Sequence, residues 1–113
     1  MIEGYQFGQI KIAGQIYTSD VIIKAGEIIS GWWRKEGHKC YWEDITPYLS
    51  SEIKCVILGT GAYGLMRPDS SLIAKLRERG IEIIIQPTKE AVKSFNERVS
   101  EVKSILAGFH LTC

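Results

Sequence analysis

The sequence is poor in the residues that build metal and redox sites, with three cysteines and two histidines among 113 residues. Cys40, Cys55 and Cys113 lie far apart, and none belongs to a C-x-x-C pair. We therefore expect neither a disulfide framework nor a zinc site. His38 and His110 have no neighbours at metal-ligand spacing. The sequence predicts no metal and no cofactor, and it favours a reducing compartment.

No charge of one sign dominates, and no long hydrophobic run is present. The 14 basic and 13 acidic residues leave a net charge of +1, too small to gather nucleic acid or an anionic membrane surface. No stretch reaches the roughly 18 to 20 apolar residues that cross a bilayer, and the first residues do not resemble a leader. We expect a cytoplasmic location without nucleic-acid or membrane partners.

The residues that are present predict a single α/β domain over residues 1–113, of which 45% are hydrophobic. The first third alternates apolar and polar residues, as antiparallel hairpins do. Ala13-Gly14 and Ala25-Gly26 supply turns that require positive φ. The segments expected to pair are 7–12 with 15–17, and 21–23 with 28–33.

After this third, strands alternate with helices. Continuous apolar runs are typical of buried strands, and apolar residues three or four apart are typical of helices. The order strand, helix, strand, helix implies parallel pairing with a right-handed crossover. The predicted elements are one or two helical turns near 42–49 that include Pro47, a central strand at 54–58, a helix at 68–79, a buried strand at 81–85, and a helix capped by Thr88 with an apolar stripe of Val92, Phe95, Val99, Val102 and Leu106.

Residues 59–64, the glycine loop, match the dinucleotide-binding pattern G-x-G-x-x-G after a predicted strand. In that pattern the third glycine, which would be Gly64, opens the helix whose amides face the pyrophosphate. The helix signal begins only at Pro68, which itself lacks an amide donor. We therefore do not interpret the loop as a dinucleotide site.

Two other interpretations of the glycine loop stay open. Its amides, around Gly59, Thr60, Gly61 and Gly64, could form a concave anion site to which Arg67 adds charge. Alternatively, the glycines only let the chain turn sharply, with Tyr63 and Leu65 packing back onto the protein.

Three further side chains are candidates for binding. Trp32 and Trp33 are adjacent, so in a strand one would enter the core while the other covers a surface beside Arg34. Tryptophan and arginine are enriched at binding hot spots. Asp20 is interpreted most simply as a turn-forming carboxylate between strands.

Five segments together resemble one family: 2–8, 17–23, 31–38, 58–61 and 109–113. These stretches, among them Gly-Trp-Trp-Arg and Leu-Gly-Thr-Gly, are similar to the adipogenesis-associated Mth-like proteins, whose domain also occurs in a mitochondrial complex I assembly factor. The resemblance implies a three-layer fold around a mixed sheet of about five strands. It implies no reaction. The positions that it singles out are Asp20, Trp32, Arg34, Gly59, Thr60, Gly61 and His110.

Three functions follow as hypotheses. The leading one is a binding or assembly module with a protein partner rather than an enzyme, because no nucleophile, base and metal set accompanies the Trp-Arg cluster. The second is a site for a small anionic ligand, with or without catalysis, at the glycine loop and Arg67. The third is self-association of two copies through exposed edge strands and an outward tryptophan.

Overall fold

The computed structural model describes residues 1–113 and begins with a small antiparallel sheet of three strands in the order β1-β2-β3. The strands are β1 (Ile2–Gln6), β2 (Gln9–Ile12) and β3 (Gln15–Tyr17). The predicted turn is present, with Ala13 at φ 49° and Gly14 at φ 82°. Phe7 and Gly8, predicted to begin a strand, instead form the turn between β1 and β2.

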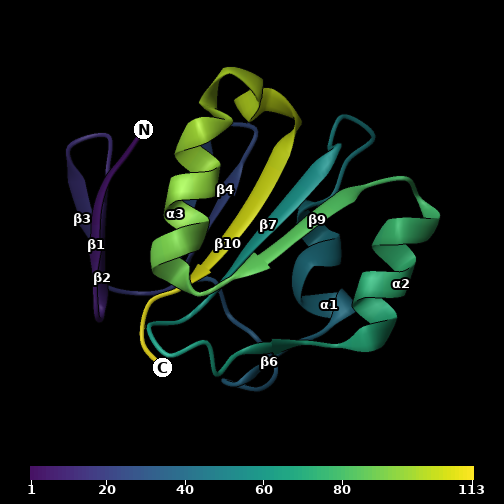
Figure 1. The fold of residues 1–113 in the computed structure, drawn as a ribbon, viewed down its shortest axis with the longest axis horizontal. Coiled ribbons are helices and arrows are strands. Elements are labelled where there is room, and N and C mark those ends of the chain that lie inside the picture. The colour runs from purple at the N-terminus through teal and green to yellow at the C-terminus, as the bar shows by residue number, and fades with distance from the viewer.

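The centre of the molecule is a five-stranded mixed sheet, as the Mth-like resemblance implies (Figure 1). Its strands lie in the order β5-β4-β10-β7-β9. β10 pairs antiparallel with β4 and parallel with β7, and β7 pairs parallel with β9. The strands are β4 (Val21–Lys24), β5 (Glu27–Ser30), β7 (Cys55–Thr60), β9 (Glu82–Gln86) and β10 (Ile105–His110).

Helices cover both faces of this sheet, which gives three layers. α3 lies on one face, and α1 and α2 lie on the other (Figure 1). None of the helices is long and apolar enough to span a membrane. The remaining elements are β6 (Lys39–Cys40), α1 (Trp42–Ile45), η1 (Thr46–Tyr48), β8 (Arg67–Pro68), α2 (Ser70–Glu78), α3 (Thr88–Glu97) and η2 (Val99–Ser104).

The C-terminal segment corrects the sequence prediction most clearly. The helix predicted to continue through Leu106 ends at Glu97, and Ile105–His110 forms β10, the middle strand of the sheet. The helical spacing of Val99, Val102 and Leu106 therefore does not reflect a continuation of α3. Leu106 packs on the opposite face of the sheet from Phe95, with which the stripe had grouped it.

Three element details also differ. Pro68 lies in β8, and α2 begins at Ser70, because the Asp69 side chain caps the helix by accepting from Ser71 N at 3.1 Å. Thr88 is the first residue of α3 rather than its cap. β9 is an edge strand that is only half-buried, not a strand buried on both faces. The two short helical turns that include Pro47 are as predicted.

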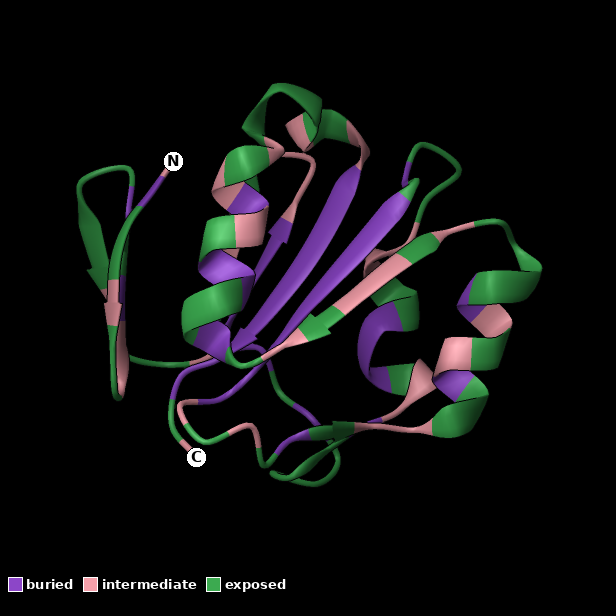
Figure 2. Ribbon diagram, viewed as in Figure 1, coloured by how far each residue is buried: buried purple, intermediate pink, exposed green.

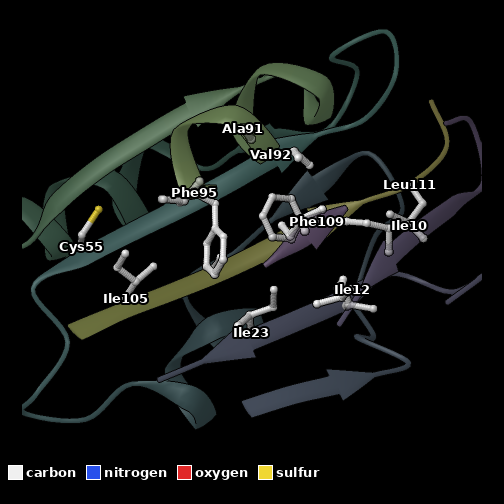
Figure 3. Packing of buried hydrophobic residues seen from close by; sticks show 14 residues of the cluster. Ile10, Ile12, Ile23, Cys55, Ala91, Val92, Phe95, Ile105, Phe109 and Leu111 are labelled. Carbon is white, nitrogen blue, oxygen red and sulfur yellow. The ribbon is translucent and has the colours of Figure 1, made fainter. Parts of the chain in front are cut away.

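The sheet separates two hydrophobic clusters, and its inner strands β7 and β10 are buried along their whole length (Figure 2). The first cluster lies between the sheet, α3 and the small N-terminal sheet (Figure 3). At its centre Phe95 and Phe109 pack edge to face, with ring centroids 6.1 Å apart. The second cluster lies under α1 and α2. Both clusters therefore depend on the same two strands.

Candidate functional site

The sheet brings together three polar residues that are far apart in the sequence. His110 is the last residue of β10, and Asp20 immediately precedes β4. Because Val21 pairs with Phe109 in the antiparallel ladder, Asp20 is placed beside His110. Arg34 reaches the same point from the loop after β5. We call Asp20, Arg34 and His110 the polar cluster.

Asp20 is the centre of the polar cluster. Its Oδ2 atom lies 2.8 Å from Nη1 of Arg34 and 2.8 Å from Nδ1 of His110. Its Oδ1 atom accepts a 2.8 Å hydrogen bond from the Leu111 amide. Burial of the Asp20 carboxyl opposes ionisation, but the hydrogen bonds that it accepts outweigh this penalty and place its pKa below the ordinary value. Asp20 is thus a partly buried partner of the buried Arg34 and not the simple turn former predicted.

Arg34 is 92% buried, which corrects its expected place on a surface beside an outward tryptophan. Its Nη2 atom donates to Gly37 O at 2.9 Å and lies 3.0 Å from Nδ1 of His110. Its guanidinium stacks over Trp32, with Cζ 4.7 Å from the centre of the ring. The arginine therefore joins its own loop to the core.

His110 Nδ1 lies between an acceptor on Asp20 and a donor on Arg34. When Nδ1 carries a proton it donates to Asp20, and when it does not it accepts from Arg34, so one tautomer cannot satisfy both contacts. Two buried nitrogens, Nε of Arg34 and Nε2 of His110, have no hydrogen-bond partner. None of the surface hollows is lined by the polar cluster.

Trp32 and Trp33 face opposite directions, as predicted, although they lie in a loop rather than in a strand, because β5 ends at Ser30. Trp32 is only 4% exposed, and its Nε1 donates to Asp44 O at 3.0 Å. Its ring packs so closely on Gly108 that a Cβ there would lie 2.8 Å from it. Trp33 is 76% exposed.

A hollow of about 450 Å³ lies beside Trp33. Pro47 and Tyr48 contribute apolar surface, while Lys35 and Glu43 contribute one charge of each sign. We call this feature the Trp33 groove. Its lining is Gly31, Trp33, Lys35, Glu43, Asp44, Pro47 and Tyr48.

Three amides of the glycine loop already donate hydrogen bonds within the chain. Gly61 N donates to Thr88 Oγ1 at 2.8 Å, Ala62 N donates to Thr112 O at 2.6 Å, and Gly64 N donates to Gly61 O at 3.3 Å. Gly61 has φ +103°, and a Cβ there would lie 2.3 Å from the backbone of Cys113. The loop thus holds the residues that follow β10, and an anion at this loop would have to displace them.

The side chains around the glycine loop also differ from the turn interpretation. Tyr63 and Leu65 do not pack back into the core but are exposed, and Tyr63 instead contacts the Phe7 ring, with centroids 6.1 Å apart. Arg67 is exposed, and its backbone N–H pairs with His38 O at 2.9 Å.

Thr88 links the glycine loop to the polar cluster, a role that the sequence does not indicate. Its Oγ1 accepts from Gly61 N and donates to His110 O at 2.6 Å. His110 and the loop therefore adjoin, and Arg34 meets His110 from the other side. The pairing register of the strands brings Thr88 next to Gly61 and His110. The sequence does not reveal that register, so this role of Thr88 could not be predicted.

Residues 2–110 match a family described as a protein of unknown function (DUF498/DUF598). The chain belongs to this family. Its structure is similar to that of a conserved hypothetical protein from Pyrococcus horikoshii, with 31% identity, a TM-score of 0.84, and coverage of 100% of this chain and 99% of the other. A protein of Bartonella henselae described as an outer membrane protein shares 25% identity over 99% and 94% of the two chains, with a TM-score of 0.81.

The fold is also that of an Mth938-like domain from Bordetella pertussis, with 11% identity, a TM-score of 0.69, and coverage of 97% and 84% of the two chains. The Mth-like resemblance inferred from five sequence segments is thereby confirmed. The protein thus has the fold of an Mth938-like domain and belongs to a family whose function is unknown.

Two of the cysteines, Cys40 and Cys55, are buried and not placed for nucleophilic chemistry. Burial raises the pKa of the Cys40 thiol to about 12 and that of the Cys55 thiol to about 11. The structure has no group of three or more His, Cys, Asp or Glu side chains that could hold a metal ion.

Proposed function

We propose that this Mth938-like domain is a binding module that uses Trp33 as the anchor for a protein partner. The observation that carries the proposal is the contrast between Trp33 and its two neighbours. Trp33 exposes 76% of its surface, whereas Trp32 and Arg34 are buried. A partner that covers this side chain would remove a large apolar surface from water, which favours binding.

The neighbours of Trp33 hold it in place before any partner binds. On one side Trp32 packs against Gly108 and bonds to Asp44 O. On the other side Arg34 is fixed by Asp20 and His110. The backbone at Trp33 is therefore ordered in the free protein, and binding costs little additional conformational entropy.

The chemistry of the Trp33 groove fits a protein segment that inserts an apolar side chain. Trp33, Pro47 and Tyr48 offer apolar and aromatic contacts, and the exposed Lys35 and Glu43 offer charges of both signs. An apolar centre with a polar rim is the usual anatomy of protein interfaces. Tryptophan is among the residues most enriched at their hot spots.

Photo-crosslinking in the cells that make the protein tests this proposal. A benzoyl-phenylalanine replaces Trp33 in one variant and Tyr63 in a matched variant, because Tyr63 is equally exposed, at 71%, but lies on the glycine loop. We expect a specific protein adduct from position 33 only. With the purified partner, Trp33→Ala should weaken binding about 30-fold, as loss of a hot spot does, and Tyr63→Ala should change it less than about twofold.

Two results would contradict the proposal. The first is an unchanged affinity of Trp33→Ala for the crosslinked partner, and the second is adducts that form equally from both positions. An adduct between two copies of the chain, together with a sedimentation coefficient that rises with concentration, would instead support self-association.

A further inference from the structure

A second hollow lies on a different part of the surface from the Trp33 groove, beside α1 and the end of α2. It has a volume of about 450 Å³ and lies where the chain enters β7 and β9. Trp42, Leu49, Ile53 and Ile81 contribute the apolar part of its lining. We call it the Trp42 groove. Its volume lies within the range of small-molecule sites.

The charges of the Trp42 groove have one sign. Lys54 and Arg79 line it, Ser50 and Ser51 add hydroxyl groups, and no acidic side chain contributes to the lining. Lys75 adds a third cation, because its Nζ lies 5.5 Å from the centre of the Trp42 ring. A region that combines apolar walls with positive charge favours a ligand that has an apolar body and a negative group.

Arg79 has donors left for such a ligand. Its Cζ lies 4.7 Å from the centre of the Trp42 ring, and its Nη1 donates to Lys75 O at 2.9 Å. The guanidinium makes no other hydrogen bond within the protein. The contact with Lys75 O also neutralises part of the negative C-terminal end of α2, which would otherwise repel an anion. With both Arg79 and Lys75 already against Trp42, a cationic ligand is disfavoured.

We propose that the Trp42 groove binds a small amphipathic anion, an aromatic or aliphatic carboxylate or phosphate. Its apolar part lies beside Trp42 and against Leu49 and Ile81, and its anionic group accepts hydrogen bonds from Arg79 and Lys54. This inference does not depend on Trp33 or on a protein partner.

Nuclear magnetic resonance titration with 1-naphthoate tests the inference on the whole chain. We expect shifts of the Trp42 indole N–H and of the amides of residues 49–54 and 79–81. The neutral 1-naphthalenemethanol should bind about tenfold more weakly, because it lacks the charge-assisted hydrogen bond. Arg79→Gln and Lys54→Gln should each weaken 1-naphthoate binding about tenfold.

Arg77→Gln is the matched control, because Arg77 is exposed on the same helix and does not line the groove. It should leave the affinity unchanged, as should Trp33→Ala. The inference is overturned if 1-naphthoate causes no shifts at these residues, if the acid and the alcohol bind equally, if 1-naphthylmethylammonium binds more tightly, or if Arg77→Gln weakens binding as much as Arg79→Gln.

Discussion

At the scale of single residues, Asp20 is the position on which the polar cluster depends. Its carboxylate contacts Arg34, His110 and the Leu111 amide, which come from a loop, a strand end and the segment after it. Removing one member of a buried ion pair leaves the other charge without compensation. Asp20→Asn should therefore destabilise the fold although it keeps the size of the side chain.

We expect Asp20→Asn to lower the free energy of unfolding at pH 7 by about 3 kcal/mol, measured by urea denaturation. Glu82→Gln is the control, because it removes an exposed pair with Arg98 and should cost less than about 1 kcal/mol. Equal unfolding free energies for Asp20→Asn and the wild type would contradict the buried role of Asp20.

The lowered pKa of Asp20 also fixes the direction of a pH effect. In the unfolded chain the pKa of this carboxyl is about 3.9. In the folded protein its pKa is lower, so it stays ionised down to a lower pH. The stabilisation is therefore complete above the unfolded pKa and is lost as the pH falls through the folded pKa. The difference in unfolding free energy between wild type and Asp20→Asn should narrow below about pH 4.

At the scale of elements, Asn96 ties the small N-terminal sheet to α3. Its Oδ1 accepts from Ile2 N at 3.0 Å, and its Nδ2 donates to Ile2 O at 2.8 Å. The side chain thus acts as a strand partner for β1. The amino group of Met1 also donates to Oδ1, at 3.5 Å, and Ile2, Ile10 and Ile12 add apolar packing in the first cluster.

We expect Asn96→Ala to destabilise the protein by about 1–3 kcal/mol, because it leaves both polar groups of Ile2 without their partner. Hydrogen exchange should increase first in β1 and β2, while β7 and β10 keep their protection. Lys93→Ala, an exposed substitution on the same helix, should leave exchange unchanged. Uniform loss of protection across all strands would show that Asn96 has no such local role.

At the scale of the whole molecule, the two hydrophobic clusters should fold as one unit. Successive residues of β7 and β10 point to opposite faces of the sheet, so each strand supplies side chains to both clusters. Ile57 and Phe109 belong to the first cluster, and Leu58 and Leu106 belong to the second. Loss of either cluster removes support from the shared strands.

Phe95→Ala should therefore affect the face of the sheet that it does not contact. We expect the free energy of unfolding to fall by about 3–5 kcal/mol. Trp32 lies in the second cluster and is the only tryptophan left in a Trp33→Phe, Trp42→Phe background. Its fluorescence during denaturation should show the same decrease in the free energy of unfolding. Helical circular dichroism should give the same denaturant midpoint. Separate midpoints would show that the two faces unfold independently.

The sequence by itself determined the features that depend on neighbouring residues. Ala13-Gly14 and Ala25-Gly26 fix their turns, Gly80 marks the end of α2, and the apolar run at Cys55–Leu58 forms a strand. The alternation of adjacent side chains separates Trp32 from Trp33. These features follow from backbone conformation and local hydrogen bonding, and the combination of segments was sufficient to indicate the family.

Only the tertiary structure decided which segments meet. Residues 105–110 fit either a helical stripe or a buried strand, and pairing with both β4 and β7 selected the strand. That pairing brought His110 to Asp20 and Arg34, and it placed Thr112 on the amide of Ala62 in the glycine loop. The reason is physical: strand pairing and the burial of charge depend on partners distant in the chain, whose register no local pattern records.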